Sequence, residues 1–275
     1  MFFLKLEKLI FYIFIFSIPF QTRLILRSWG VGFNEWNSAF LYWTDLLILG
    51  FLLLWFFRQS HFYAIAQKLD SQKKNIFSNY DWFLVGFLAV SALSIINASN
   101  QALGFYQLLK LIEFSLLYFY VKSNFGAVFD LTKSLFVFLA SGVFQAILAI
   151  SQYFRQSDFG LRFLGETVLN PDLFNVAVFT VEGEKIMRSY GTFPHPNVLA
   201  FFLFIAIFIF YFLYLTSPSL GQSKYKFLIY GFLLFGFFLT FSRIIVFLWL
   251  IGFVFLIRKL NKKMLRFYIH AYQSH

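Results

Sequence analysis

The run NVLAFFLFIAIFIFYFLYL, residues 197–215, holds no charged side chain. As a helix it is long enough to cross a hydrocarbon layer about 30 Å thick. Composition agrees, because 60% of the residues are hydrophobic and only 13% are charged, which is too apolar for a surface solvated by water. Further apolar runs lie at residues 6–21, 40–57, 82–97, 102–121, 134–154, 227–241 and 244–257. The sequence therefore predicts an all-α, polytopic helical membrane protein, with about eight transmembrane helices in one domain over residues 1–275.

The last two runs are the least certain division of the chain. Residues 227–241 and 244–257 are each shorter than the roughly 17 residues expected of a span, and only Ser242 and Arg243 separate them. We interpret them as two helices. A single long kinked span is the alternative, and it would invert the topology of everything that follows.

The distribution of cations supports an even number of spans. Basic residues gather on the cytoplasmic side of bacterial membrane proteins. With both termini inside, fifteen of the 23 Lys and Arg residues fall on the cytoplasmic side, seven fall outside, and Lys110 lies within a span. Arg188 and Arg243 are among the outer seven. The net charge of +11 is thus interpreted as a topology signal, and no nucleic-acid partner is needed to explain it.

The main extracytoplasmic loop spans residues 155–196. Residues 175–181 and 185–190 are short β-prone runs that flank Glu182-Gly183-Glu184, a pattern that predicts a small β-hairpin. The hairpin would bring Arg188 to the membrane surface. Proline is favoured in the first turn of a helix, so we expect the sixth helix to begin at about Pro196.

Two arginines lie where loops meet apolar helices. Arg188 precedes the sixth helix, and Arg243 follows an apolar run and begins the next. Cations at a membrane surface suggest a site for an anionic, lipid-linked substrate. The alternative is that these loop arginines bind lipid phosphates or pair with acidic residues of the loop, namely Glu166, Glu182 or Glu184.

A wider pattern surrounds these arginines. Arg188, Gly191, Thr192, Phe193, Pro196 and Asn197 precede an apolar helix, and Thr240-Phe241-Ser242-Arg243 follows it; Asp45, Gln145, Gln152 and residues 159–166 come earlier. In this order and spacing, the chain resembles the O-antigen ligase and O-antigen polymerase superfamily of bacterial inner-membrane glycosyltransferases. The resemblance covers nearly the whole chain, and its most specific parts are residues 188–197 and Ser242-Arg243.

The resemblance implies a reaction and a set of partners. Members transfer a glycan from an undecaprenyl diphosphate carrier to a saccharide or lipid acceptor at the outer face of the inner membrane, without nucleotide sugar, cofactor or metal. It implies that Arg188 and Arg243 hold the diphosphate, whose negative charge grows as the sugar leaves. Gly191, Asn197 and Ser242 are the accompanying motif positions. It does not distinguish a ligase from a polymerase.

His195 has two interpretations. An imidazole titrates in the range suited to deprotonating an acceptor hydroxyl, which makes it a candidate catalytic base. It also lies between two prolines, where a polar side chain would close the start of a helix.

In the resembled family the catalytic histidine lies in a larger external loop after the span that corresponds to residues 244–257. No such loop occurs in this sequence, so we expect the chain to be the N-terminal part of such a protein, and a non-catalytic truncated relic is an alternative.

Charged side chains inside a span suggest a second class of protein, a transporter. Lys110 and Glu113 lie three residues apart on one face of the fourth helix. Ionisable groups within spans often belong to transport routes, so a transporter or flippase for a lipid-linked saccharide is the alternative function. The sequence has no internal repeat, however, and a structural Lys110–Glu113 pair that bonds helices together is favoured. Dependence of activity on the proton gradient would favour the transporter.

Overall fold

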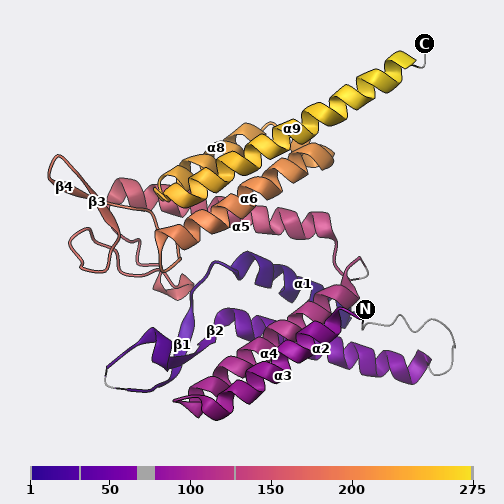
Figure 1. The fold of residues 1–275 in the computed structure, drawn as a ribbon, viewed down its shortest axis with the longest axis vertical. Coiled ribbons are helices and arrows are strands. Elements are labelled where there is room, and N and C mark those ends of the chain that lie inside the picture. The colour runs from indigo at the N-terminus through magenta and orange to yellow at the C-terminus, as the bar shows by residue number, and fades with distance from the viewer. Residues whose placement is uncertain (1, 31, 67–77, 127, 274–275) are drawn as a thin grey trace. The chain divides into compact units, whose positions relative to one another are not determined.

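The computed structural model describes residues 2–30, 32–66, 78–126 and 128–273. The chain is mostly helical, with 67% of its residues in helices. It divides into two compact units (Figure 1). The first unit comprises residues 1–141 and 162–165, and the second comprises residues 142–161 and 166–275.

Each apolar run of the sequence overlaps one α-helix of the structure. The corresponding helices are α1 (Phe2–Ser17), α2 (Trp43–Ala66), α3 (Asp81–Ser94), α4 (Gln101–Asn124), α5 (Leu131–Arg155), α6 (Pro196–Thr216), α8 (Lys226–Phe238) and α9 (Arg243–Gln273). Within the described ranges, α4, α5 and α6 are the three that are long and apolar enough to cross a membrane. The helical class is therefore confirmed.

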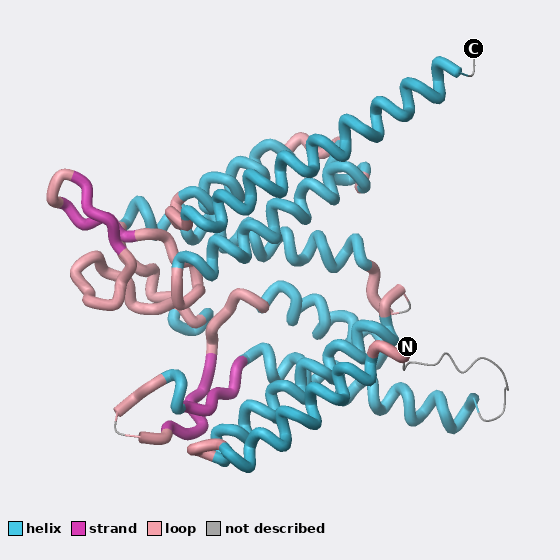
Figure 2. The backbone as a smooth tube through the Cα atoms, in the orientation of Figure 1, coloured by secondary structure: helices cyan, strands magenta, loops and turns pink. Residues whose placement is uncertain are grey.

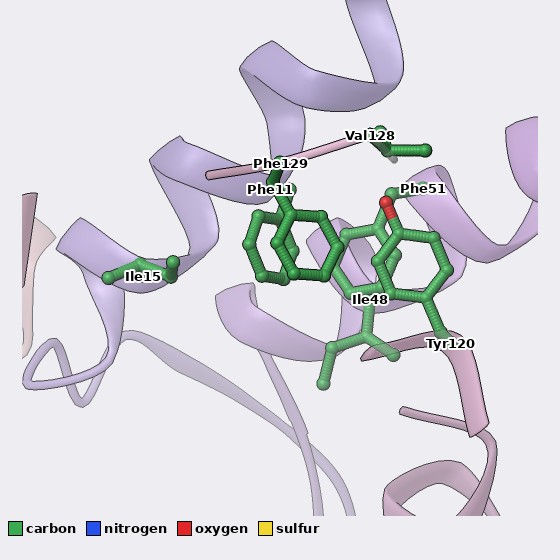
Figure 3. Packing of buried hydrophobic residues seen from close by; sticks show 7 residues of the cluster. All are labelled: Phe11, Ile15, Ile48, Phe51, Tyr120, Val128 and Phe129. Carbon is green, nitrogen blue, oxygen red and sulfur yellow. The ribbon is translucent and has the colours of Figure 1, made fainter. Parts of the chain in front are cut away.

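The first unit is built around aromatic rings from α1, α2, α4 and the segment that follows α4 (Figure 3). The ring centroids of Phe11 and Phe129 lie 4.1 Å apart in a stacked arrangement, and those of Phe51 and Tyr120 lie 4.6 Å apart. Offset and tilted ring pairs of this kind contribute about 0.5–1.5 kcal/mol each beyond the area they bury. This cluster fixes α1 against α2 and α4.

Charged side chains of the first unit are paired between helices. Lys110 Nζ bonds Asp45 of α2 and lies 3.4 Å from a carboxylate oxygen of Glu113. The predicted Lys110–Glu113 contact is thus confirmed, and Asp45 is the additional partner that ties α4 to α2. Further along α2, Arg58 donates from Nε and Nη2 to the fully buried carboxylate of Glu7, at 2.9 and 3.1 Å.

A β-hairpin that the sequence analysis did not predict connects α1 to α2. Strand β1 (Arg23–Ser28) pairs antiparallel with β2 (Ser38–Tyr42), and the register shifts between Ile25 and Arg27. The hairpin is closed at its base by a hydrogen bond from Trp43 N to Thr22 O, 3.0 Å long. Its tip contains the short 3-10 helix η1 (Glu35–Asn37).

The second unit packs α6 against α8 and α9 (Figure 2). Tyr211 of α6 joins the three helices, because its hydroxyl lies 2.7 Å from that of Tyr230 on α8 and accepts the indole N–H of Trp249 on α9 at 3.3 Å. The short helix α7 (Pro218–Gly221) lies between α6 and α8 in the sequence.

The predicted loop hairpin is present in the second unit. Strand β3 (Val178–Val181) pairs with β4 (Glu184–Met187) through a two-residue turn. Glu182 and Gly183 both have positive φ, 51° and 89°, as a type I′ turn requires. The predicted strands at 175–181 and 185–190 were therefore correctly located but too long, and α6 begins at Pro196 as predicted.

The two helices at the end of the sequence are separate. Helix α8 ends at Phe238 and α9 begins at Arg243. Phe241, between them, has φ of +47°, a conformation that cannot continue a right-handed helix. The Trp249 ring lies 5.7 Å from that of Phe238, so α9 folds back along α8. The prediction of two helices in residues 227–257 is therefore confirmed, and the alternative of a single long kinked helix is excluded.

Candidate functional site

Residues 188–193 are held against α5 by two glutamines. Gln152 accepts the backbone N–H groups of Tyr190 and Gly191, at 3.2 and 2.7 Å, and donates to the carbonyl of Gly191 at 2.8 Å. Gln145 accepts the N–H of Thr192 at 2.9 Å and donates to its hydroxyl at 3.0 Å. Both amides are fully buried. Side chains seven residues apart share one helix face, so α5 forms a polar strip that fixes the loop.

Gly191 requires the absence of a side chain. Its φ is +60°, and a Cβ there would overlap the amide oxygen of Gln145. The backbone approaches α5 closely enough for both glutamines to bond it only because this position is glycine. The motif position expected from the sequence thus has a structural reason.

Arg188 is fixed by two neutral partners. Its Nε donates to the carbonyl of Thr240 at 2.7 Å, and its Nη2 donates to Oδ1 of Asn197 at 2.7 Å. A guanidinium has five N–H donors, and these two bonds use two of them. Three N–H groups therefore remain without an acceptor among the described residues. No carboxylate forms a salt bridge with Arg188 in that part of the chain.

Glu166, the buried acidic residue of the loop, has other partners. Glu166 is buried and accepts from Gln152 at 2.8 Å and from the N–H groups of Phe159 and Leu161, at 2.9 and 2.7 Å. Its carboxylate organises the loop. The alternative in which Arg188 pairs with Glu166, Glu182 or Glu184 is not what the structure shows over the described residues.

Arg243 is the first residue of α9 and is exposed. The carbonyl of the preceding buried Ser242 accepts the N–H of Val246 at 3.0 Å, which is the first turn of the helix. Ser189 N donates to Leu239 O at 3.2 Å. With the bond from Arg188 to Thr240, this joins the loop before α6 to the loop before α9. The structure therefore bonds Arg188 to Asn197 and to the loop that leads into Ser242 and Arg243, whereas no contact joins the Arg243 side chain to Arg188 among the described residues.

His195 occupies the N-cap position of α6. Its Nδ1 accepts the backbone N–H of Asn197 at 3.1 Å, and its carbonyl accepts the N–H of Val198 at 3.0 Å. Burial, and then the charge of Arg188, lower the pKa of His195 below 6.5. The imidazole is therefore neutral at pH 7, with the lone pair of Nδ1 engaged by the helix. The interpretation as a helix cap explains this position without catalysis.

The electrostatic character of the site is positive. Helices α6 and α9 both begin beside it, and the aligned peptide dipoles of a helix give its start a partial positive charge. Burial lowers the pKa of Arg188, but a guanidinium remains charged at any physiological pH. The arrangement suits an anion with oxygens on more than one side.

Some of these roles were outside the reach of sequence reasoning. The acceptor at Thr240 is a backbone carbonyl, and two of the three bonds of Glu166 come from backbone N–H groups, which carry no sequence signal. Gln145 and Gln152 stood out in the sequence through the family resemblance, and the structure gives their role. Among the described residues no group of three His, Cys, Asp or Glu side chains could hold a metal ion. No protein-family model, curated protein or solved structure matches the chain.

Proposed function

We propose that the chain is a multi-pass protein of the bacterial inner membrane, in which all eight long helices cross the bilayer and both termini are cytoplasmic. The three long apolar helices support this, as do large apolar side chains that face outward from the shorter ones. Phe83 on α3 is 78% exposed, and Phe227 on α8 is 74% exposed. Such side chains, repeated along every helix, favour a lipid surround over water.

We further propose that the protein transfers a glycan from an undecaprenyl-diphosphate-linked donor to a saccharide or lipid acceptor at the outer face. The function is of the O-antigen ligase or polymerase type. One observation supports it above the others: Arg188 is fixed by a carbonyl and an amide, and keeps its full charge and three N–H donors. A guanidinium that served only to stabilise the loop would be expected to pair with a carboxylate.

The chemistry follows from that charge. Cleavage of the sugar–phosphate bond leaves a lipid diphosphate, and negative charge grows on its oxygens in the transition state. Arg188 and Arg243 bind those oxygens, and the helix dipoles of α6 and α9 add positive potential at the same place. Because Arg188 is held in place before the substrate arrives, little reorganisation is needed. Each such donor contributes about 3–4 kcal/mol to the transition state.

The test is transfer of glycan in membrane vesicles supplied with a diphosphate-linked donor. We expect Arg188→Ala and Arg243→Ala each to lower the rate by about 10²–10³-fold. Arg188→Lys keeps the charge but loses the bidentate geometry, so its rate should fall between those of Arg188→Ala and the parent. Lys185→Ala is the matched control, because Lys185 is an exposed cation on the adjacent strand β4. The proposal would be contradicted by an Arg188→Ala protein that inserts into the membrane normally and transfers glycan at the parental rate.

A transporter or flippase for a lipid-linked saccharide is the second candidate. The cluster of Asp45, Lys110 and Glu113 favours it, because one Glu113 oxygen is buried and has no hydrogen-bond partner among the described residues. Buried carboxylates of this kind occur on proton routes. Collapse of the proton gradient should leave glycan transfer unchanged if the chain is a transferase. Loss of activity on collapse would favour the transporter.

A further inference from the structure

Strand β1 of the first unit exposes apolar side chains on both of its faces. Successive residues of a strand point to opposite sides, yet Leu24, Ile25 and Leu26 are all exposed, Leu24 by 67%. At the tip of the hairpin Phe33 and Trp36 are exposed as well, Trp36 by 86%. An apolar surface of this kind is unusual in water and indicates a binding surface.

The partner strand β2 faces the protein. Ser38, Ala39 and Phe40 are buried. The hydroxyl of Tyr106 on α4 accepts the N–H of Phe40 at 3.0 Å and donates to its carbonyl at 2.8 Å. The hairpin is therefore fixed to the helices through β2 and presents β1 outward (Figure 1).

The cations of the hairpin are not equivalent. Arg23 is paired with Glu35 and lies over the ring of Phe40. Arg27 is exposed and has no acidic partner among the described residues; its guanidinium lies 5.3 Å from the centre of the Trp29 ring. The surface thus combines apolar side chains, indole rings and one unneutralised cation, the combination enriched where proteins meet lipid headgroups.

The backbone of β1 favours a surface of lipid headgroups over other binding partners. Its outer edge carries N–H and C=O groups with no strand beside them in the described chain, which excludes immersion in hydrocarbon but not contact with hydrated headgroups. The shift in register between Ile25 and Arg27, with Arg27 on the edge, disfavours pairing with a strand of a second copy. Both features favour a lipid surface.

We propose that the β1–β2 hairpin is an interfacial anchor. Leu24, Ile25 and Leu26 lie at the boundary between headgroups and acyl chains, and Arg27 binds the phosphate of an anionic lipid. This inference rests on the membrane location proposed above and is independent of glycan transfer.

The test uses the absence of cysteine from the chain, which allows a single nitroxide to be attached wherever one cysteine is introduced. Leu24→Cys and Leu26→Cys report on the hairpin, in the full chain embedded in nanodiscs of phosphatidylglycerol and phosphatidylethanolamine. Phe83→Cys on α3 is the control for lipid contact, and Glu184→Cys on β4 is the control for water. At each site the collision rate with oxygen, which concentrates in lipid, is compared with that of a water-soluble nickel complex.

We expect oxygen collisions to exceed nickel collisions at positions 24, 26 and 83, and the reverse at 184. Nickel collisions in excess at 24 and 26, with position 83 in lipid, would overturn the anchor alone. Low rates of both at 24 and 26 would mean that protein covers β1, and would overturn it equally. Nickel collisions in excess at 83 would overturn the membrane location as well.

The role of Arg27 has its own comparison. Arg27→Gln should shift the ratio at position 24 toward nickel in phosphatidylglycerol nanodiscs and leave it unchanged in phosphatidylcholine nanodiscs, because only the first carries net negative charge. Lys185→Gln, on the other hairpin, should leave the ratio at position 24 unchanged in both. An equal shift in the two lipids would show that Arg27 does not bind an anionic headgroup.

Discussion

Substitution of Gly191 by alanine tests how the loop is held on α5. Two costs are expected. The first is the left-handed backbone at φ +60°, roughly 1–2 kcal/mol for a residue with a Cβ. The second is displacement of the Gln145 amide, which is fully buried and makes two hydrogen bonds with Thr192. A buried polar group that loses its partners costs about 1–3 kcal/mol. We therefore expect Gly191→Ala to lower the free energy of unfolding by about 2–5 kcal/mol.

Gly160 supplies the matched control. Its φ is +76°, and a Cβ there would meet nothing within 4 Å. Gly160→Ala carries the backbone cost alone, roughly 1–2 kcal/mol. The difference between the two variants isolates the contact with Gln145.

The assay is unfolding of the purified protein in mixed detergent micelles, followed by circular dichroism and fitted to a free energy. A third variant, Gln145→Ala, removes the obstructing amide, so the added cost of Gly191→Ala in that background should fall toward the cost of Gly160→Ala. Equal losses for Gly191→Ala and Gly160→Ala in the parental background would refute the close approach of the loop to α5.

Three further outcomes are expected. His195 has a lowered pKa in the folded state, so its contribution is complete above pH 6.5 and is lost as pH falls through the folded-state value; His195→Asn, a cap that does not titrate, should lose less stability than the parent between pH 7 and 5 in the same unfolding assay. Arg58→Met leaves the fully buried Glu7 unpaired and should cost about 3–5 kcal/mol, whereas adding Glu7→Gln should restore part of it. Asn197→Asp places a carboxylate on Arg188, so unfolding should require more free energy while transfer of glycan falls; an unchanged rate would count against Arg188 as an anion ligand.

The features that the sequence predicted are those with a local cause. Apolar runs predicted every long helix, since burial or lipid contact of a run depends on its own side chains. Pro196 predicted the start of α6, and Glu182-Gly183 predicted a hairpin, because both act on the backbone where they stand. Gln145 and Gln152 lie seven residues apart, a spacing that places both on one face of a helix, and both bond the same loop.

The features that the sequence did not predict depend on distant partners. Strand β1 carries three apolar residues in a row, without the alternation of apolar and polar residues that predicts a strand. Its pairing with β2 depends on residues that lie ten or more positions away. Lys110 has an acidic residue three positions away, yet it also bonds Asp45, 65 positions back. The acceptor of Arg188 Nε is a carbonyl, which every residue possesses. Contacts of this kind leave no trace in a single sequence.

The neutral partners of Arg188 have an energetic consequence for any anion that binds there. A carboxylate partner would have to be displaced or shared, and the incoming anion would compete with it for the same donors. Thr240 and Asn197 fix the guanidinium through bonds that leave its charge uncompensated. The desolvation of that charge is already part of the folded state, as the lowered pKa of Arg188 indicates. Binding of an anion there would relieve an electrostatic cost that the folded state already carries.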